Sequence, residues 1–279
     1  YFVRRTVRRK FVSKEKRDRA PLIAPLQPRL IEGGYASAGL LSDILIKKYV
    51  DHLPLYRQER ILRERHGIEL SRKTMCDWVD KGADWLQAIY QHIAAELRES
   101  NYLQVDETPV RYNQRDGGGS GKGYLWAYHR PGRDVLFEWH TSRAADCLDG
   151  MLGEFKGIIQ SDGYRAYDSF AAAHQNIELA ACWAHARRKF HDAKDESKFA
   201  AWVLCQIGRL YQLERETDGF APALRCAIRC SHGKMLLSLI KRALRLKQTR
   251  FLPKSATGKA INYTLSLWDK LVLYCDAGQ

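Results

Sequence analysis

No segment of the chain reaches the roughly 18 consecutive apolar residues of a transmembrane helix, so we expect no membrane partner. The seven cysteines are scattered without a regular spacing, and no secretory signal precedes them. This usage is typical of reduced thiols and predicts a cytoplasmic protein. The sequence also lacks an internal repeat at the spacing of solenoid proteins, which excludes a repeat architecture.

Acidic residues are missing from one long stretch of the chain. Residues 234–254 contain seven Lys/Arg and no acid, and residues 1–20 contain nine Lys/Arg against two acids. These two basic patches account for the whole net charge of +14. Clustered basic charge is typical of a polyanion partner, because each neutralised phosphate releases counterions. The alternative is a solvated face that maintains solubility, but two separate clusters favour nucleic acid.

Changes in composition along the chain predict four parts. Residues 1–12 mix Val and Thr with basic residues, as strands do, and residues 20–34 hold three prolines and two glycines, as linkers do. The four parts are a basic strand and linker (1–34), a helical DNA-binding region (35–100), an α/β core (101–192) and a helical insertion domain (193–279).

The DNA-binding region is predicted to begin with two helices joined by a short turn. The first covers residues 38–51, and the second begins at Pro54. We expect Tyr49 and Tyr56 to lie on the inward faces of these helices. The second helix should end at Gly67, because glycine suits the residue that follows a helix.

A third helix is expected after Ser71, which is a plausible N-cap. Helix, glycine-containing turn and helix form the helix-turn-helix pattern, in which the second helix of the pair enters a major groove. Its first residues, Arg72, Lys73 and Thr74, are types that contact bases and phosphates. The alternative is an ordinary helical hairpin.

The core, residues 101–192, alternates strand and helix patterns in the order βββαβαβα. This order is typical of a ribonuclease H-like fold of the mixed α/β (α+β) class, in which the first and fourth strands are neighbours. The glycine-rich segment 117–121 joins two strands and is predicted to be a hairpin loop, not a phosphate loop. The predicted strands are 102–112, 123–130, 134–140, 156–161 and 177–183, with helices over 143–152, over 163–173 and from 184.

Two aspartates end apolar, strand-like runs of this core. Asp106 lies in Tyr-Leu-Gln-Val-Asp-Glu-Thr-Pro and Asp162 in Gly-Ile-Ile-Gln-Ser-Asp-Gly-Tyr. Each has an alternative role as a turn or helix-capping residue. Together they favour a shared metal site, because Mg²⁺ prefers carboxylate oxygens and two such ions can clamp a phosphoryl displacement. Glu107 would point to the opposite face of its strand, which makes it a poor third ligand.

Cys182 and His185 follow the fifth strand, three residues apart at the start of a helix. Two ligands are too few for structural zinc, so we expect a polar contact set beside the aspartates. Arg187, Arg188 and Lys189 come next and suit phosphate contact, with a solvated helix face as the alternative.

A second group of potential metal ligands comprises Cys226, Cys230 and His232. The two cysteines have the i, i+4 spacing of a helix. Because structural zinc requires a fourth ligand, we favour buried thiols.

Several stretches, in order, carry a family resemblance: Tyr-Val-Asp-His-Leu-Pro-Leu-Tyr-Arg-Gln-Glu (49–59), Val-Asp-Glu-Thr-Pro-Val (105–110), Gln-Ser-Asp-Gly-Tyr-Arg-Ala-Tyr (160–167) and Ala-Cys-Trp-Ala-His-Ala-Arg-Arg-Lys-Phe (181–190). Over nearly its whole length the chain resembles IS66-type insertion-sequence transposases, which are DDE transposases. The resemblance implies a bacterial, nucleoid-associated DNA transposase that recognises terminal inverted repeats, cuts DNA and joins it to target DNA as a homo-oligomer. It also implies two Mg²⁺ ions held by Asp106, Asp162 and a glutamate, with Cys182 and His185 as the family's Cys-x-x-His motif.

The chain departs from the family pattern in two places. It lacks the paired cysteines that commonly follow the segment matching residues 1–12. The third carboxylate is expected in an Asn-Asn-x-x-Glu-Arg stretch beyond Gln279, with Glu214 and Glu216 as weaker substitutes. We therefore expect a transposase fragment, cut at both ends, that binds DNA. The alternatives are a catalytically inactive DNA-binding remnant and a structure-specific nuclease.

Overall fold

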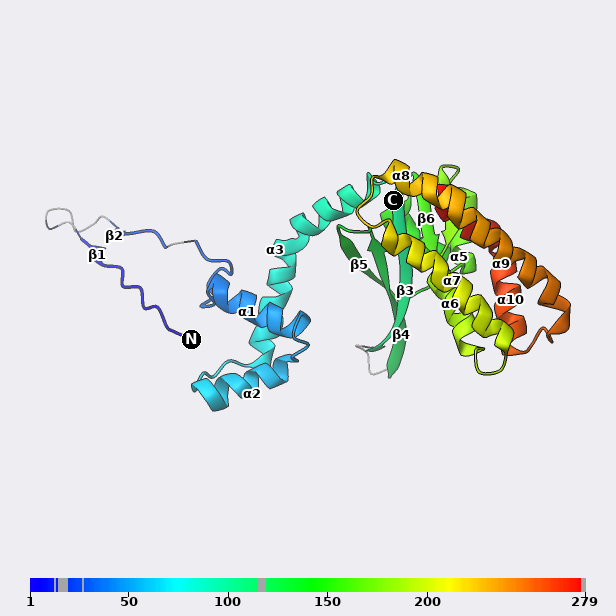
Figure 1. Ribbon diagram of the computed structural model, residues 1–279. Helices are drawn as coiled ribbons and strands as arrows, with labels where there is room; N and C mark the ends of the chain where they lie inside the picture. The colour runs from blue at the N-terminus through cyan, green and yellow to red at the C-terminus, as the bar shows by residue number, and fades with distance from the viewer. Residues whose placement is uncertain (13, 15–19, 27, 115–118, 277–279) are drawn as a thin grey trace. The chain divides into compact units, whose positions relative to one another are not determined.

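The computed structural model describes residues 1–12, 14, 20–26, 28–114 and 119–276. The chain forms two compact units, Tyr1–Ile89 and Tyr90–Gln279 (Figure 1). The boundary falls inside helix α3 (Arg72–Arg98), so this helix contributes residues to both units. The four-part division expected from the sequence stays a prediction.

The first unit begins with a short hairpin, in which strand β1 (Lys10–Phe11) pairs antiparallel with β2 (Leu22–Ile23). The strand expected over residues 1–12 is therefore only two residues long. Residues 1–12 are exposed throughout, so they bury no apolar face that would stabilise a longer ladder. Parts of the predicted linker and of the predicted glycine-rich loop lie outside the described residues.

Three helices build the core of the first unit: α1 (Ala38–Tyr49), α2 (Leu55–His66) and the first part of α3. The expectation that Tyr49 and Tyr56 face inward is wrong, since they are 60% and 52% exposed. Gln58 occupies the interior instead, because its amide donates to the carbonyls of Ile44 and Leu53. The buried side chains are those of Leu41, Ile44, Leu55, Leu62, Leu70, Met75 and Trp78.

The turn between α2 and α3 has the predicted caps. Gly67 adopts a left-handed φ of 62° and donates its N–H to the Arg63 carbonyl, which ends α2. Ser71 Oγ accepts the N–H of Thr74 at 3.1 Å, as an N-cap does. The helix–turn–helix connection that the sequence predicted is therefore present.

The second unit is built on a mixed sheet with the strand order β5-β4-β3-β6-β7 among the described residues. β3, β4 and β5 form an antiparallel meander, β6 pairs parallel to β3, and β7 pairs parallel to β6. The first and fourth strands of the core are therefore neighbours, as expected. The strands are β3 (Tyr102–Asn113), β4 (Ser120–His129), β5 (Val135–His140), β6 (Gly157–Ser161) and β7 (Ile177–Ala181).

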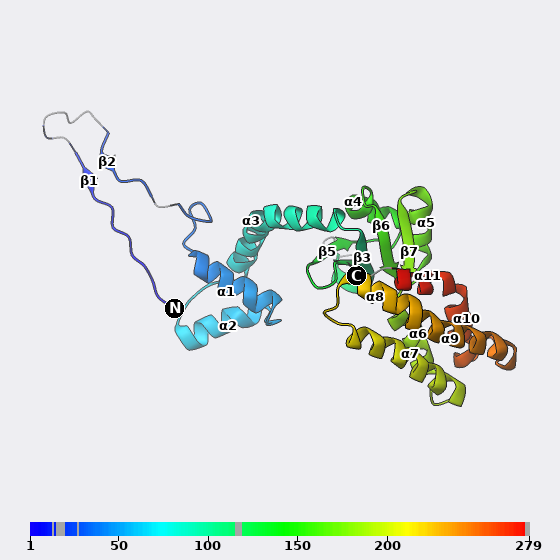
Figure 2. The ribbon, with the colours of Figure 1, turned by 45° about the horizontal axis from the view of Figure 1, so that its top comes forward.

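Helices connect the later strands of the sheet, and further helices come after β7 in the chain. The connection between β5 and β6 is the 3₁₀ turn η1 (Ala145–Leu148) and α4 (Asp149–Leu152), shorter than the helix predicted over 143–152. Next come α5 (Arg165–Ala173), α6 (Trp183–Asp192), α7 (Lys198–Glu216), α8 (Pro222–Ile228), the π-helical turn η2 (Arg229–Gly233), α9 (Lys234–Lys247), η3 (Gln248–Arg250), α10 (Ala256–Ser266), α11 (Trp268–Val272) and η4 (Leu273–Asp276). Figure 1 and Figure 2 show α7, α9 and α10 gathered beside one another.

The two faces of the sheet have different surroundings because side chains alternate along each strand. One face is apolar and packs against the last turns of α3, α4 and α5 through residues such as Leu103, Val105 and Ile159. On the other face, Gln104 is half-buried and Asp106 is exposed. A separate apolar core joins α6, α7, α9, α10 and α11 around Phe190, Val203 and Ile240.

β3 separates from β6 partway along its length, and this point positions the site. The pairing of β3 with β6 ends at Gln104 and Gln160, whereas its pairing with β4 continues to Asn113. Beyond Gln104, one edge of β3 is therefore unpaired in the described structure. Pro109, which cannot donate a backbone hydrogen bond, is tolerated there because it needs no partner on the open side.

Candidate active site

Asp106 and Asp162 flank the point where β3 and β6 diverge. The parallel register aligns Gln104 with Gln160, and each aspartate lies two residues further along its chain. Asp106 and Asp162 thus each follow the last paired position by two residues, and the alternation of side chains places Asp106 on the face of β3 that carries Gln104. The glutamines also share a side-chain hydrogen bond of 2.9 Å.

Asp162 ends β6 in a tight turn that fixes its carboxylate. Its Oδ1 accepts the N–H of Tyr164 at 2.8 Å, so the turn role considered from the sequence is real. Gly163 has a φ of +81°, and a Cβ there would meet Leu267, so glycine suits this turn. The second oxygen, Oδ2, lies 3.7 Å from a guanidinium nitrogen of Arg143. One oxygen of Asp162 is thus committed to the turn, and the other remains at the divergence point.

Asp106 lies in regular strand, paired with Ala127 of β4, and is exposed. The alternative role as a turn residue is therefore wrong. The Asp106 side chain forms no hydrogen bond or ion pair with the described residues, so its carboxylate oxygens remain available to a ligand. The charges of Asp106 and Asp162 both raise the pKa of His185, after the larger effect of its contact with Cys182.

Glu107 points away from Asp106 into the apolar face, as the strand alternation predicted. Its side chain is 1% exposed and is bound by Arg143 and by the Tyr167 hydroxyl at 2.7 Å. Burial raises the pKa of Glu107, although the contacts with Tyr167 and Arg143 partly oppose this rise. Arg143, which the sequence analysis did not single out, therefore bridges the buried Glu107 and the site residue Asp162.

Cys182 and His185 lie at the start of α6, next to the same edge of the sheet. The backbone N–H of Cys182 donates to the Ser161 carbonyl, which ties the α6 start to the end of β6. Burial raises the pKa of the Cys182 thiol, but the contact with the His185 side chain and backbone hydrogen bonds of Ala184 and His185 together leave the pKa below its ordinary value. The expected polar contact set is present, and the buried Nδ1 of His185 has no partner among the described residues.

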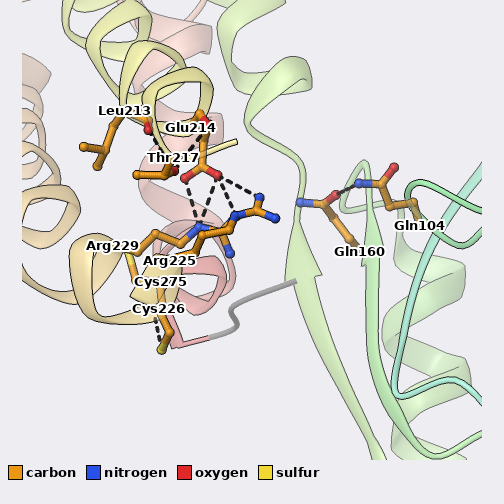
Figure 3. A network of polar contacts seen from close by, with 9 residues as sticks. All are labelled: Gln104, Gln160, Leu213, Glu214, Thr217, Arg225, Cys226, Arg229 and Cys275. Carbon is orange, nitrogen blue, oxygen red and sulfur yellow. Dashed lines mark hydrogen bonds and ion pairs between the residues drawn. The ribbon is translucent and has the colours of Figure 1, made fainter. Parts of the chain in front are cut away.

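Glu214 of α7 is held by two arginines. Its carboxylate accepts from Arg229 Nε at 2.9 Å and Nη2 at 2.5 Å, and Arg225 Nη2 lies at 3.5 Å (Figure 3). Glu214 and Asp106 both line a cavity of about 1200 Å³. The helical segment thus brings Glu214 to the same cavity as Asp106, but with both carboxylate oxygens in use.

Comparison with known proteins identifies the family of this chain. The model of the Transposase IS66 family matches residues 33–279. The chain belongs to the IS66 transposase family. Its relatives include uncharacterized proteins of Sinorhizobium fredii (strain NBRC 101917 / NGR234). Protein y4qI is 33% identical over 280 residues, an alignment that covers 94% of this chain and 52% of the relative. Protein y4jD is 32% identical over 293 residues, an alignment that covers 99% of this chain and 57% of that relative.

A third relative from the same organism, uncharacterized protein y4hP, is 26% identical over 301 residues, covering 98% of this chain and 53% of the relative. The chain therefore spans about half the length of the curated relatives it matches. Family membership supports a DNA-processing role in general and confirms the resemblance seen in the sequence.

The predicted DNA-contacting residues of the transposase chain lie on two helices. Arg72 and Lys73 are exposed at the start of α3, where Thr74 Oγ1 is within 2.9 Å of the Ser71 hydroxyl. Thr74 is therefore partly engaged in the cap, whereas the charged ends of Arg72 and Lys73 have no partner in the described part of the chain. The backbone N–H of Arg72 donates to Glu59, which ties α3 to α2. DNA contact by these residues stays a prediction.

Arg187, Arg188 and Lys189 are exposed on α6. Arg187 and Arg188 line a groove of about 610 Å³ between α6 and α7, together with Arg215. Lys189 lies outside this groove, with its ammonium 4.5 Å from the centre of the Tyr263 ring. The groove concentrates positive charge beside the cavity that holds Asp106, an arrangement that suits a phosphate backbone.

The chemistry of the two aspartates fits Mg²⁺. Carboxylate oxygens on neighbouring strands, one within β3 and one just after β6, suit this ion, which keeps several waters and takes few protein ligands. Within the described ranges, no three His, Cys, Asp or Glu side chains gather closely enough to hold a metal by themselves. Cys226 and Cys230 are free thiols that are half-buried, not buried as expected, and their sulfurs contact the Cys275 carbonyl. No helix in the described part of the chain is both long and apolar enough to span a membrane.

The sequence analysis missed two residues that organise the site, Gln104 and Gln160. A signal was available, because each aspartate is preceded by glutamine at the same spacing, Gln104-Val-Asp106 and Gln160-Ser-Asp162. The repeated Gln-x-Asp pattern predicts two strands in register with like residues side by side.

Proposed function

We propose that this chain carries the DNA-cutting and DNA-joining site of an insertion-sequence transposase on a ribonuclease H-like core. The observation that carries the proposal is the parallel register of β3 and β6, in which Gln104 pairs with Gln160 two residues before Asp106 and Asp162. The meander followed by parallel crossovers supports the fold, and the family match supports the activity. The substrates would be terminal inverted repeats and target DNA, bound by a homo-oligomer.

Asp106 and Asp162 would hold Mg²⁺ through their carboxylate oxygens, in a DDE site that takes two ions when complete. Bound Mg²⁺ supplies charge neutralisation at the attacking and leaving oxygens of a phosphoryl displacement. Asp162 is suited to this role because the Tyr164 N–H and Arg143 fix its orientation. Asp106 is suited because its carboxylate has no competing partner among the described residues.

The other residues would bind and orient DNA. The start of α6 adjoins the ends of β6 and β7, and helix N-termini attract phosphate. His185, whose pKa is raised by Cys182 and by the two aspartates, would present a positive charge to the strand. Arg187, Arg188 and Lys189 would contact the backbone. Arg72, Lys73 and Thr74 at the start of α3 would enter the major groove of the terminal repeat.

The test uses the full-length protein and DNA that carries both ends of its own element. With Mg²⁺ we expect cleavage at the ends and joined products, and Asp106→Asn or Asp162→Asn should lower the rate by at least about 10³-fold, since each removes a preorganised charge from the site. Lys156→Gln, an exposed residue at the opposite end of β6, is the matched control. Cleavage that both aspartate variants retain would overturn the proposal.

A catalytically inactive DNA-binding remnant is the second candidate. It is favoured by one observation: Glu214, the described carboxylate considered as a third ligand, is paired with Arg225 and Arg229. The two candidates differ in one result. A remnant binds the element ends with the same affinity in wild type and Asp106→Asn, and neither protein yields cleaved or joined DNA.

A further inference from the structure

A large cavity lies between the aspartate-bearing face of the sheet and the helices that follow it. Its volume of about 1200 Å³ exceeds the usual range for small-molecule sites. Gln104, Asp106 and Gln160 line it from the sheet, and Glu214 and Arg225 line it from α7 and α8. The proposed metal site occupies only the part next to Asp106, so the remaining volume is available to a longer ligand.

Hydrogen-bond donors dominate the helical wall. Arg229 is 6% exposed and binds Glu214 through Nε and Nη2. Arg225 touches Glu214 with only one nitrogen, at 3.5 Å, and its buried Nε–H has no partner among the described residues. Glu214 therefore orients both guanidinium groups, while Arg225 keeps hydrogen-bonding capacity that the protein does not use.

A chain of amides forms the facing wall. The amide of Gln104 donates to Gln160 Oε1 at 2.9 Å, and Gln104 Oε1 lies 3.0 Å from His129 Nδ1. Because its oxygen accepts this bond, Gln160 retains an NH₂ group that forms no hydrogen bond with the described residues. Figure 3 shows the Glu214–arginine cluster and the Gln104–Gln160 pair facing each other.

Other unused polar atoms belong to residues of the same cavity. Within the described structure, Arg130 Nε, His185 Nδ1 and the Tyr274 hydroxyl are buried and have no hydrogen-bond partner, like Arg225 Nε. All four residues line the cavity. Buried polar groups in native proteins are nearly always paired, so several unpaired groups around one cavity indicate a polar ligand. Two of the four, the guanidinium N–H groups of Arg130 and Arg225, can only donate, which favours an acceptor-rich anion.

We infer that Arg225 and Gln160 bind a backbone phosphate of a DNA strand that enters this cavity beside Asp106, with Glu214 as the positioning residue for Arg225. Phosphate offers the acceptor oxygens that a guanidinium and an amide require. The inference rests on the proposed function for the identity of the strand. Free phosphate has the same chemistry, and the experiment separates it from DNA.

The experiment measures binding of a short fluorescein-labelled single-stranded oligonucleotide by fluorescence anisotropy in EDTA, between about 50 and 200 mM salt. Arg225→Gln should weaken binding about tenfold and lower the slope of log K against log salt by about 0.7, the value for one contact to single strands. Gln160→Ala should weaken binding about threefold without changing the slope, because it removes no charge. Lys156→Gln, at the opposite end of β6, should change neither.

Further variants test the roles. Arg225→Lys keeps the charge, so a folded Arg225→Lys protein should keep the wild-type slope and lose affinity through geometry alone. In a Glu214→Ala background, Arg225→Gln should reduce the affinity for the oligonucleotide by less than about threefold, because Glu214 no longer orients Arg225. The assay contains EDTA and measures binding alone, so a failure of Mg²⁺-dependent DNA cleavage leaves this test unaffected.

Two results would overturn the inference. The first is unchanged affinity and slope in Arg225→Gln, which means that no phosphate contacts this residue. The second is full displacement of the oligonucleotide by inorganic phosphate at matched phosphate concentration, which assigns the site to free phosphate and not to a DNA strand.

Discussion

The side-chain amide of Gln104 donates a 2.9 Å hydrogen bond to Gln160, across the last paired position of two parallel strands. This bond lies two residues before Asp106 on one strand and two residues before Asp162 on the other. It therefore fixes the register of the two strand segments that lead to the aspartates. Beyond it β3 and β6 are no longer paired in the described structure.

Removing Arg143 should destabilise the protein in a pH-dependent way. Arg143→Met leaves Glu107, whose side chain is 1% exposed, without its ion-pair partner. Breaking a buried pair costs about 3 kcal/mol or more, although the Tyr167 hydrogen bond remains. Because burial raises the pKa of Glu107 above its ordinary value of 4.5, its contribution to stability is present below about pH 4.5 and is lost as the pH rises through its folded pKa.

The measurement is urea unfolding of wild type and Arg143→Met at pH 5 and pH 8. The variant should lose more free energy of unfolding between these pH values, since the pKa of Glu107 rises further without Arg143. The double variant Glu107→Gln/Arg143→Met should restore the weaker pH dependence. An equal pH dependence in wild type and Arg143→Met would show that Arg143 does not stabilise the ionised carboxylate.

The thiol of Cys182 should be reactive because of His185. His185→Gln removes the side-chain contact that helps to lower the pKa of Cys182 against the effect of burial, so this pKa should rise. Each unit of pKa increase reduces the thiolate population tenfold at neutral pH but raises its nucleophilicity, for a net slowing of about threefold. Alkylation by iodoacetamide at pH 7, followed by peptide mass spectrometry, measures the rate. Exposed Cys205 is the internal control, and equal Cys182 rates in both proteins would contradict the proposed pairing.

The sequence predicted the core well because alternation and turn residues are local signals. All five core strands occur within three residues of their expected bounds, in the expected order. The helix over 143–152 is the weakest element, and it is only a 3₁₀ turn and a short α-helix. Gly150 and Gly153 lie in or beside it, and glycine disfavours helix. The strand over residues 1–12 had suitable residues but no buried face to pair.

The sequence predicted the site residues only where a local sequence pattern marks them. Asp106 lies within β3, and Asp162, Cys182 and His185 come directly after strands, so their common neighbourhood could be inferred from topology. Arg143 lies in a loop after β5, and nothing in its neighbours indicates that it contacts Glu107. The pairing of Glu214 with Arg229 also depends on how the chain turns between α7 and η2, which no spacing rule gives. Long-range ion pairs require tertiary structure to be seen.

The groove between α6 and α7 should contribute charge-dependent DNA binding. Arg188→Gln and Arg215→Gln each remove one positive charge from its walls. If each residue contacts one phosphate, each substitution lowers the slope of log K against log salt by about 0.9 for duplex DNA. Filter binding of a random-sequence duplex over a salt series measures the slope, with Lys156→Gln as the charge-matched control. Wild-type slopes in both groove variants would place the duplex elsewhere, for example on the exposed basic residues of α9.

Binding of a divalent ion should depend on Asp106 and Asp162 but not on Glu214. Mn²⁺ serves as the probe because it accepts the same oxygen ligands as Mg²⁺ and is followed by electron paramagnetic resonance. Asp106→Asn and Asp162→Asn should each weaken Mn²⁺ binding by at least about tenfold, since each removes an anionic ligand. Glu214→Gln should bind Mn²⁺ as wild type does. If this carboxylate moved to a metal, Arg229, whose side chain is only 6% exposed, would lose its ion-pair partner. Leaving a buried cation unpaired costs about 3–5 kcal/mol. Asp218→Asn, an exposed acid on the rim of the same cavity, controls for the loss of negative charge. Equal losses in Glu214→Gln and Asp106→Asn, with Asp218→Asn unchanged, would mean that the arginines release Glu214 when metal binds and that Glu214 is the third ligand.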